Sequence, residues 1–323
     1  MYYNKSYWTA GILYLVMFLV GSGSSVHAQY GGTAGAFARI GFGARGVAMG
    51  NAMTAVVSGE LSPYYNPALT AFQSDHVITA AYTVMSLDRS LNFLQYSQHL
   101  KKSAGVAIGF IQSGVSKIDG RDSDGIPTGD LSTSEYLFFA SFANSFTDKL
   151  TFGVTFKYYY YKLYENITAY SAAVDLGCIY AINKNMSVGI AVNDLGAKYR
   201  WDTSKIYGDQ GTTTIDAFPT IIKIGIAETL FDSTVTAAID YVTSPQDTHH
   251  LHVGVEWNPL ESFSLRAGCD RIDLQDRWSG AMPTFGFAVS CPLPGWRPTI
   301  HYAYGIEPFA PSGIHIISVT VGF

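Results

Sequence analysis

From His76 to Phe323 the sequence repeats one simple unit, in which apolar and polar side chains alternate over about ten residues before a few turn residues. Segments of this length and period are typical of strands that cross a membrane. We expect strands near 76–86, 90–100, 104–115, 134–146, 149–164, 168–182, 185–195, 218–230, 233–243, 248–258, 262–271, 282–291, 296–306 and 313–323. The pattern predicts an all-β fold, a transmembrane antiparallel β-barrel of about 14 strands formed by residues 76–323, and bacterial barrels do have an even number of strands.

The two faces of these strands differ in polarity. Phe152, Phe156 and Tyr158 lie on one face of the fifth segment, and Thr151 and Lys157 lie on the other. A soluble β-sandwich also alternates, but its outer face is polar. Only 14% of the residues are charged and 48% are hydrophobic, which favours lipid outside the ring and water, or the chain itself, inside it.

The connections between the expected strands fall into two classes. The long ones, 116–133, 196–217 and 272–281, are all odd-numbered, and the even-numbered ones are all short. Outer-membrane barrels have short periplasmic turns and longer extracellular loops. We therefore expect the chain to enter the barrel from the periplasm.

The first residues are typical of a secretory signal peptide. Lys5 gives a positive start, residues 10–20 are apolar, and Val26-His27-Ala28 offers a small-x-small cleavage pattern. The apolar run is too short for a transmembrane helix. We expect residues 1–28 to be removed and the mature chain to reach the bacterial cell outer membrane.

A stretch rich in Gly and Ala, Gly31–Phe72, precedes the first strand. Small residues at this density let one backbone pass close to another, and Pro67 after Asn66 fixes a turn. We interpret residues 29–75 as a hatch, a compact plug inside the barrel. Gly41-x-Gly43-x-x-Gly46 also matches the dinucleotide-binding fingerprint, but no alternating strands and helices follow it. We therefore expect no cofactor.

The hatch carries a motif made of Arg39, Gly41, Gly43, Arg45, Gly46, Gly50, Asn66, Pro67 and Ala68. This motif resembles the N-terminal signature of the PorV/PorQ family of bacterial outer-membrane proteins, which are related to FadL-type transporters. The resemblance implies a plugged barrel that is not an enzyme. It also implies that the last residue, Phe323, is recognised by the barrel-assembly machinery.

Two functions follow from this resemblance. The PorV/PorQ family implies an accessory or scaffold role in type IX-like protein secretion, with secretion-system proteins as partners. The FadL relationship implies a transporter of hydrophobic or small amphipathic molecules. An apolar pocket in the lumen would favour transport, and a broad apolar surface on the outer loops would favour the scaffold. Outer-membrane lipid is a partner in both cases, whereas a net charge of -5 without a basic stripe argues against nucleic acid.

Charged residues on faces predicted to point inward are Lys157, Asp175, Lys223, Asp240, Glu256 and Arg266. Counting outward from the hairpin turns places them in three pairs of opposite charge, in the order given. Such pairs would neutralise a narrow interior or guide a solute. Arg39 and Arg45 of the hatch also need partners, because a buried charge without one is costly. The candidates are Asp175, Asp240 and Glu256.

Two further groups of residues are candidate metal ligands. Asp119, Asp122 and Asp124 lie in the first long loop and could hold Ca²⁺, although their spacing does not match an EF-hand. His250 and His252 share a strand face without a third ligand nearby. We therefore expect no metal. No Ser–His pair suited to lipid hydrolysis is evident on the outer face, so we expect no enzyme activity.

Overall fold

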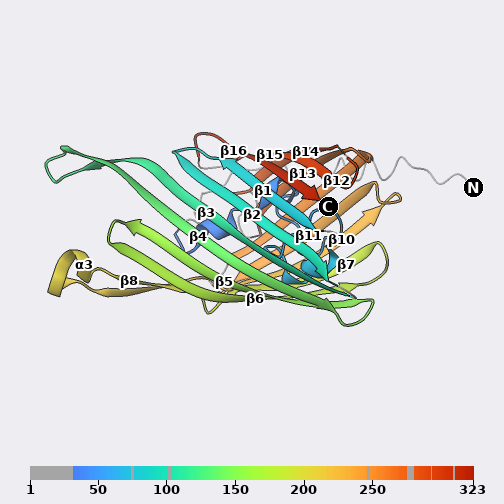
Figure 1. Cartoon of the computed structure of the whole chain (residues 1–323), viewed down its shortest axis with the longest axis horizontal. Coiled ribbons are helices and arrows are strands. Elements are labelled where there is room, and N and C mark those ends of the chain that lie inside the picture. The colour runs from blue at the N-terminus through green and yellow to red at the C-terminus, as the bar shows by residue number, and fades with distance from the viewer. Residues whose placement is uncertain are drawn as a thin grey trace, which may run out of the picture.

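The computed structural model describes residues 32–73, 76–100, 103–245, 248–274, 280–291, 293–307 and 310–323. Fourteen strands form a closed antiparallel barrel in which β1 pairs with β16 (Figure 1). This confirms the predicted all-β barrel. The predicted signal peptide, residues 1–28, lies outside the described residues.

The barrel strands are β1 (Val77–Val84), β2 (Arg89–Leu100), β3 (Ala104–Arg121), β4 (Pro127–Ser145), β5 (Leu150–Tyr164), β6 (Ile167–Ala181), β7 (Met186–Leu195), β10 (Ile221–Leu230), β11 (Val235–Ser244), β12 (Thr248–Leu260), β13 (Phe263–Asp273), β14 (Met282–Ser290), β15 (Arg297–Gly305) and β16 (Ile314–Gly322). Each expected segment corresponds to one of these strands. No described helix is long and apolar enough to span a membrane.

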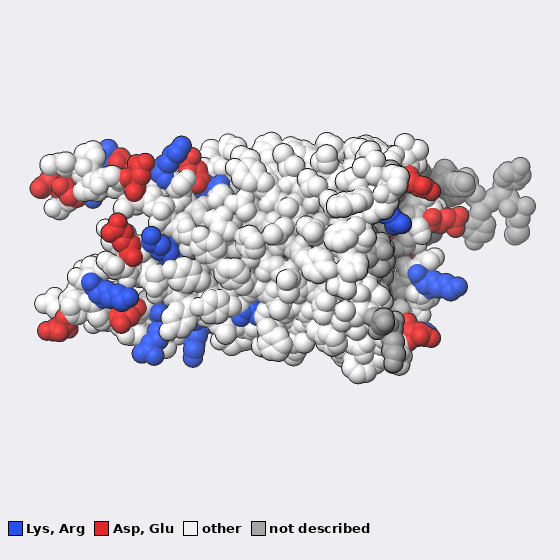
Figure 2. Space-filling view, viewed as in Figure 1, with Lys and Arg blue, Asp and Glu red and all other residues white. Residues whose placement is uncertain are grey.

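The outer surface of the barrel carries a belt of exposed apolar side chains. Phe138, Phe156, Leu176, Ile239 and Phe285 belong to it, and each is at least two-fifths exposed. Figure 2 shows this belt as a white band, with charged side chains gathered at its two ends. Water would not tolerate so large an apolar surface, but hydrocarbon does. The closed ring and its apolar belt place the protein in the bacterial outer membrane.

Two expected outer loops are more ordered than the sequence indicated. β3 and β4 continue past the predicted boundaries into 116–133, because Ile118 and Leu131 pair beyond the register shift after Val115. The result is a two-stranded ribbon that projects beyond the barrel (Figure 1). Residues 196–217 hold a second hairpin, made of β8 (Lys198–Asp202) and β9 (Thr213–Ala217), with α3 (Ser204–Tyr207) and η3 (Gly208–Gln210) between them.

Two of the β-bulges in the barrel wall place polar side chains next to the lumen. Asp194 at φ 63° makes one between β6 and β7, and Arg271 at φ 55° makes the other between β12 and β13. At each bulge two residues face one on the neighbouring strand, here Asp175 and His252. Each bulge therefore turns an additional polar side chain toward the lumen.

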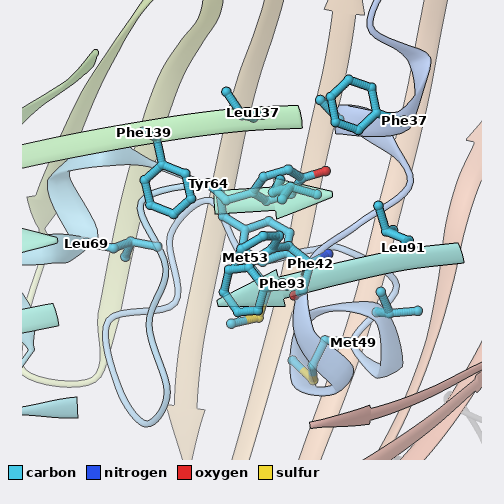
Figure 3. Packing of buried hydrophobic residues seen from close by; sticks show 14 of the residues in the cluster. Phe37, Phe42, Met49, Met53, Tyr64, Leu69, Leu91, Phe93, Leu137 and Phe139 are labelled. Atoms are coloured by element: carbon cyan, nitrogen blue, oxygen red, sulfur yellow. Dashed lines mark hydrogen bonds between the residues drawn. The ribbon is translucent and has the colours of Figure 1, made fainter. Parts of the chain in front are cut away.

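The hatch fills the middle of the barrel. It contains η1 (Ala36–Arg39), α2 (Gly43–Ala48) and η2 (Pro67–Phe72). Figure 3 shows Phe42 and Met53 of the hatch against Phe93 of β2, with Phe139 of β4 alongside. The main hydrophobic core of the protein is thus the contact between the hatch and the inner wall.

Candidate functional site: the hatch inside the barrel

The turn at Asn66 and Pro67 fixes the last part of the hatch. The Asn66 side chain accepts a hydrogen bond of 3.0 Å from the Ala68 amide, and so caps η2. Pro67 occupies the first turn, where its missing N–H and fixed φ are tolerated. The Asn66 amide nitrogen donates to the Thr54 carbonyl at 2.9 Å and to the Cys178 carbonyl of β6 at 3.2 Å. One side chain therefore shapes the turn and ties it to the wall.

Glycines of the barrel wall receive the main chain of the hatch. Three pairs of them lie directly opposite each other on adjacent strands, and we name these pairs the glycine seats. They are Gly153 and Gly177, Gly189 and Gly225, and Gly254 and Gly268. A Cβ at Gly254 would collide with the carbonyl group of Met49, and one at Gly268 with the amide of Gly50. Only glycine lets these two backbones approach so closely.

The other seats follow the same rule. Pro67 and Ala68 lie against Gly153, and Thr54 lies against Gly189. The motif predicted from the sequence contains glycines of the hatch and none of these wall glycines. Isolated glycines inside strands are the signal that would have revealed them, because such glycines often mark the close approach of another backbone.

Arg45 forms the central polar contact between the hatch and the wall. Its Nε and Nη2 atoms donate to the Glu256 carboxylate at 2.8 Å each, while Nη1 donates to the carbonyls of Ser58 and Glu60 at 2.7 Å. Arg266 Nε donates to Glu256 Oε2 at 2.6 Å from the neighbouring strand. Glu256 is thus shared between a hatch arginine and a wall arginine, and its pairing with Arg266 follows the expected register.

Other wall carboxylates also bind hatch groups. Asp240 accepts a hydrogen bond of 2.8 Å from the Thr54 amide. Asp270 accepts one of 2.9 Å from the Asn51 side chain and lies 2.9 Å from His252 Nδ1. The charged side chains of the barrel interior therefore bind groups of the hatch as well as one another.

Two of the three predicted cross-strand pairs are wrong in register. Asp175 lies opposite Thr155, because the β5–β6 turn is centred one residue earlier than expected. Lys157 nevertheless reaches Asp175 diagonally at 2.7 Å, and Asp194 at 2.9 Å. The bulge at Asp194, which the sequence did not reveal, makes this three-membered cluster possible.

The predicted pair of Lys223 with Asp240 does not form an ion pair. Asp240 lies opposite Gly225, because residues 231–234 all belong to the turn, whereas the prediction assumed two turn residues. Within the described part of the chain, no carboxylate lies within ion-pair distance of Lys223. Its ammonium group lies 5.4 Å from the ring centre of Tyr64 and 5.9 Å from that of Tyr65.

These two tyrosines hold the glycine-rich start of α2. The Gly41 amide donates to Tyr64 Oη at 3.2 Å, and the Phe42 amide donates to Tyr65 Oη at 3.0 Å. Burial raises the pKa of both phenols above the usual value, so they remain protonated. Gly41 and Gly43 have φ values of 122° and 69°, which explains why glycine is needed there.

Arg39 has a different role from Arg45. Its Nη2 atom donates to the Thr33 hydroxyl at 2.6 Å and to the Ala34 carbonyl at 2.9 Å. These bonds lie within the hatch. Of the three carboxylates proposed as partners of the hatch arginines, Arg45 therefore binds Glu256. The bonds of Arg39 named here end on the first turn of the hatch itself.

Aromatic side chains cover the hatch on the side of the long loops. Phe37 of η1 contacts Tyr159 edge-on at 6.2 Å, and Phe218 packs 4.8 Å from both Tyr159 and Tyr199. Trp201 of β8 extends this group outward, 5.5 Å from Tyr199. We name these five residues the aromatic cluster. It forms because β8 runs beside β6 and its buried Tyr199 packs against Phe218, which packs in turn against Tyr159.

Two cavities formed by the described residues lie at opposite ends of the hatch. The larger, of about 950 Å³, lies at the short-turn end and is lined by polar groups including Arg45, Glu60, Arg266 and His301. The smaller, of about 50 Å³, lies toward the long loops beside Lys223. The hatch therefore lies between these two cavities.

The remaining predicted residues lie apart from this site. Asp119 pairs with Arg121 at 2.7 Å, and Asp122 accepts bonds from backbone amides of its own turn. No group of three potential metal ligands is present among the described residues. The Phe323 amide donates to the His76 carbonyl at 3.0 Å, beside the seam where β1 meets β16. Its role in assembly stays a prediction.

A hatch fixed across a closed, lipid-facing ring defines the class of plugged outer-membrane β-barrels. Comparison with solved structures gives the same fold: the toluene transporter TodX of Pseudomonas putida matches 87% of this chain and 96% of its own, with a TM-score of 0.59 and 15% identity. The toluene transporter TbuX of Ralstonia pickettii gives 0.57 and 14%, over 87% of this chain and 97% of its own. A FadL homologue of Pseudomonas aeruginosa gives 0.52 and 11%, over 88% and 98%.

No protein-family model matches the sequence, and a search of curated proteins finds no match. The likeness to the solved structures shows that the chain has the FadL-like 14-strand fold. The narrower resemblance to the PorV/PorQ family stays a prediction.

Proposed function

We propose that the protein is a non-enzymatic transporter that carries hydrophobic or small amphipathic molecules across the outer membrane. The observation that carries this proposal is the hatch inside a FadL-like barrel, with one cavity at each end of it. The solved structures that share this fold are named as toluene transporters and a FadL homologue.

The aromatic cluster is the part of the lumen best suited to an apolar solute. Phe218 is 5% exposed and Tyr199 is 1% exposed, so the cluster is an aromatic region shielded from water next to the hatch. The larger cavity is lined by charged side chains such as Arg45 and Arg266, and the core around Phe42 is filled. A solute that leaves the cluster therefore needs a movement of the hatch or of its neighbours.

Uptake of toluene by cells that express the protein tests this proposal, with glucose as a polar solute for comparison. We expect toluene uptake that depends on the protein, and a several-fold loss in Phe218→Ala. Tyr207→Ala is the matched control, because Tyr207 lies in the same hairpin and is 64% exposed. Toluene uptake equal to that of cells without the protein would contradict the proposal.

A scaffold role in secretion is the second candidate. The β3–β4 ribbon and the β8–β9 hairpin favour it, because they project from the barrel and expose Ile126 at 60% and Ile215 at 61%. Isolation of the full chain from its native membrane would test it, with secretion-system proteins as the expected companions. A variant in which the ribbon between Lys117 and Leu131 is deleted should no longer copurify with these secretion-system proteins, while its barrel stays folded.

A further inference from the structure

A row of tyrosines marks one border of the apolar belt. Tyr136 of β4 lies opposite Tyr160 of β5, which lies opposite Tyr170 of β6. The rings of Tyr136 and Tyr160 are 6.2 Å apart, and Tyr170 is 69% exposed. Tyrosines gather where hydrocarbon meets the headgroups. The outer-leaflet interface therefore crosses these three strands near this row.

One step further from the belt, a cation lies between two hydroxyl groups. Lys162 of β5 pairs with Ser134 of β4 on one side and with Thr168 of β6 on the other. Residues that pair directly point to the same face, so all three side chains face outward with the tyrosines. Lys162 is exposed, and no carboxylate among the described residues lies within ion-pair distance of it.

The β8 strand adds two cations on the other flank of β6. The Lys198 amide donates to Ser171 Oγ at 2.8 Å, so β8 runs beside β6 beyond the end of β7. Tyr199 is buried and points inward, and alternation directs Lys198 and Arg200 outward, where both are exposed. Lys162 of β5 and the β8 cations therefore lie on the two strands that flank β6, the strand that carries Tyr170.

Acidic groups on this face lie further out. Asp202 follows Arg200 at the end of β8 and accepts a hydrogen bond of 2.9 Å from the Ser204 amide. Hydrogen bonds from Ser204 lower the pKa of Asp202, so this carboxylate is ionised and already bonded. Glu165 lies in the turn beyond Lys162. From the belt outward the order is aromatic, then basic, then acidic.

We propose that Lys162, Lys198 and Arg200 form a binding site for the phosphate of a phosphorylated glycolipid in the outer leaflet. Arginine and lysine are suited to phosphate, and the neighbouring hydroxyls supply further donors. Basic groups at headgroup depth attract anionic lipids. The exposed rings of Phe156 and Tyr158 lie directly below, and they give the acyl chains a surface that a soluble phosphate would not use. In the lower left of Figure 2, Lys and Arg side chains lie at this border of the white band.

Native mass spectrometry of the purified full-length chain in detergent tests the site, with bis-phosphorylated lipid A as the probe. The double variant Lys162→Gln/Arg200→Gln should bind about tenfold less tightly than the parent protein. Lys149→Gln/Lys184→Gln is the matched control, because it removes the same charge at exposed positions of the short-turn end and should bind like the parent. Heat-dependent migration on gels verifies that each variant is folded.

Two comparison lipids complete the experiment. Lipid A without phosphates should bind weakly to the parent protein, and phosphatidylglycerol should bind less tightly than lipid A. Equal binding by the double variant, equal binding of dephosphorylated lipid A, or equal binding of phosphatidylglycerol would each overturn the proposal.

Discussion

Arg45 of the hatch and Glu256 of β12 join through two hydrogen bonds of 2.8 Å each, and both side chains are nearly fully buried. A buried pair of this kind contributes modest net stability, but the loss of one partner is costly because the other charge stays buried. In this protein the second partner of Glu256 is Arg266, which belongs to the wall. The contact therefore fixes the position of the hatch more than it stabilises the barrel.

Substitution of Arg45 should loosen the hatch and leave the barrel folded. Arg45→Ala removes its bonds to Glu256 and to the carbonyls of Ser58 and Glu60, a loss of about 2–5 kcal/mol in hatch docking. Limited proteolysis between Gly46 and Tyr65 should be at least several-fold faster. Arg121→Ala removes an exposed ion pair and serves as the control. Equal protection in Arg45→Ala would remove Arg45 from this role.

Because the glycine seats have no room for a side chain, adding a single methyl group there should displace the hatch. Gly268→Ala should displace the hatch backbone at Gly50, because a Cβ there has no room. We expect a larger and noisier conductance in planar bilayers. Gly322→Ala is the matched control, since its Cβ would lie 4.0 Å from the nearest atoms. A conductance of Gly268→Ala equal to that of the parent protein would show that the wall does not need glycine at this seat.

The cluster around Asp175 should matter for the barrel itself. Asp175 is fully buried, pairs with Lys157 and accepts a hydrogen bond of 2.8 Å from the Asp194 amide at the bulge. Asp175→Asn weakens both contacts and should cost about 1–3 kcal/mol. The temperature at which the barrel loses its compact gel migration should fall by several degrees. Asp119→Asn, at an exposed pair, should leave it unchanged.

The strands and their two faces could be predicted from the sequence, because the alternation of side chains is a property of each strand alone. Period-two alternation in a strand such as β5 depends only on which side chains meet lipid, so Phe156 and Lys157 could be assigned without any partner strand. The pairing of Glu256 with Arg266 was also predictable.

The remaining features depend on details that single segments do not contain. Lys223 missed its expected partner because the turn after Leu230 is two residues longer than its sequence suggested. The bulge at Asp194 needs a left-handed backbone, which the alternation pattern does not reveal. The aromatic cluster brings Phe37 and Phe218, which are far apart in the sequence, to the ring of Tyr159, and no local pattern predicts such contacts.

The hatch closes an otherwise open ring. Single-channel conductance tests this in a variant that lacks residues 32–72, next to the full chain in the same planar bilayer. We expect a large, steady pore in the variant and a nearly closed state in the full chain, because the hatch lies between the two cavities. A folded, inserted variant that conducts no more than the full chain would contradict it.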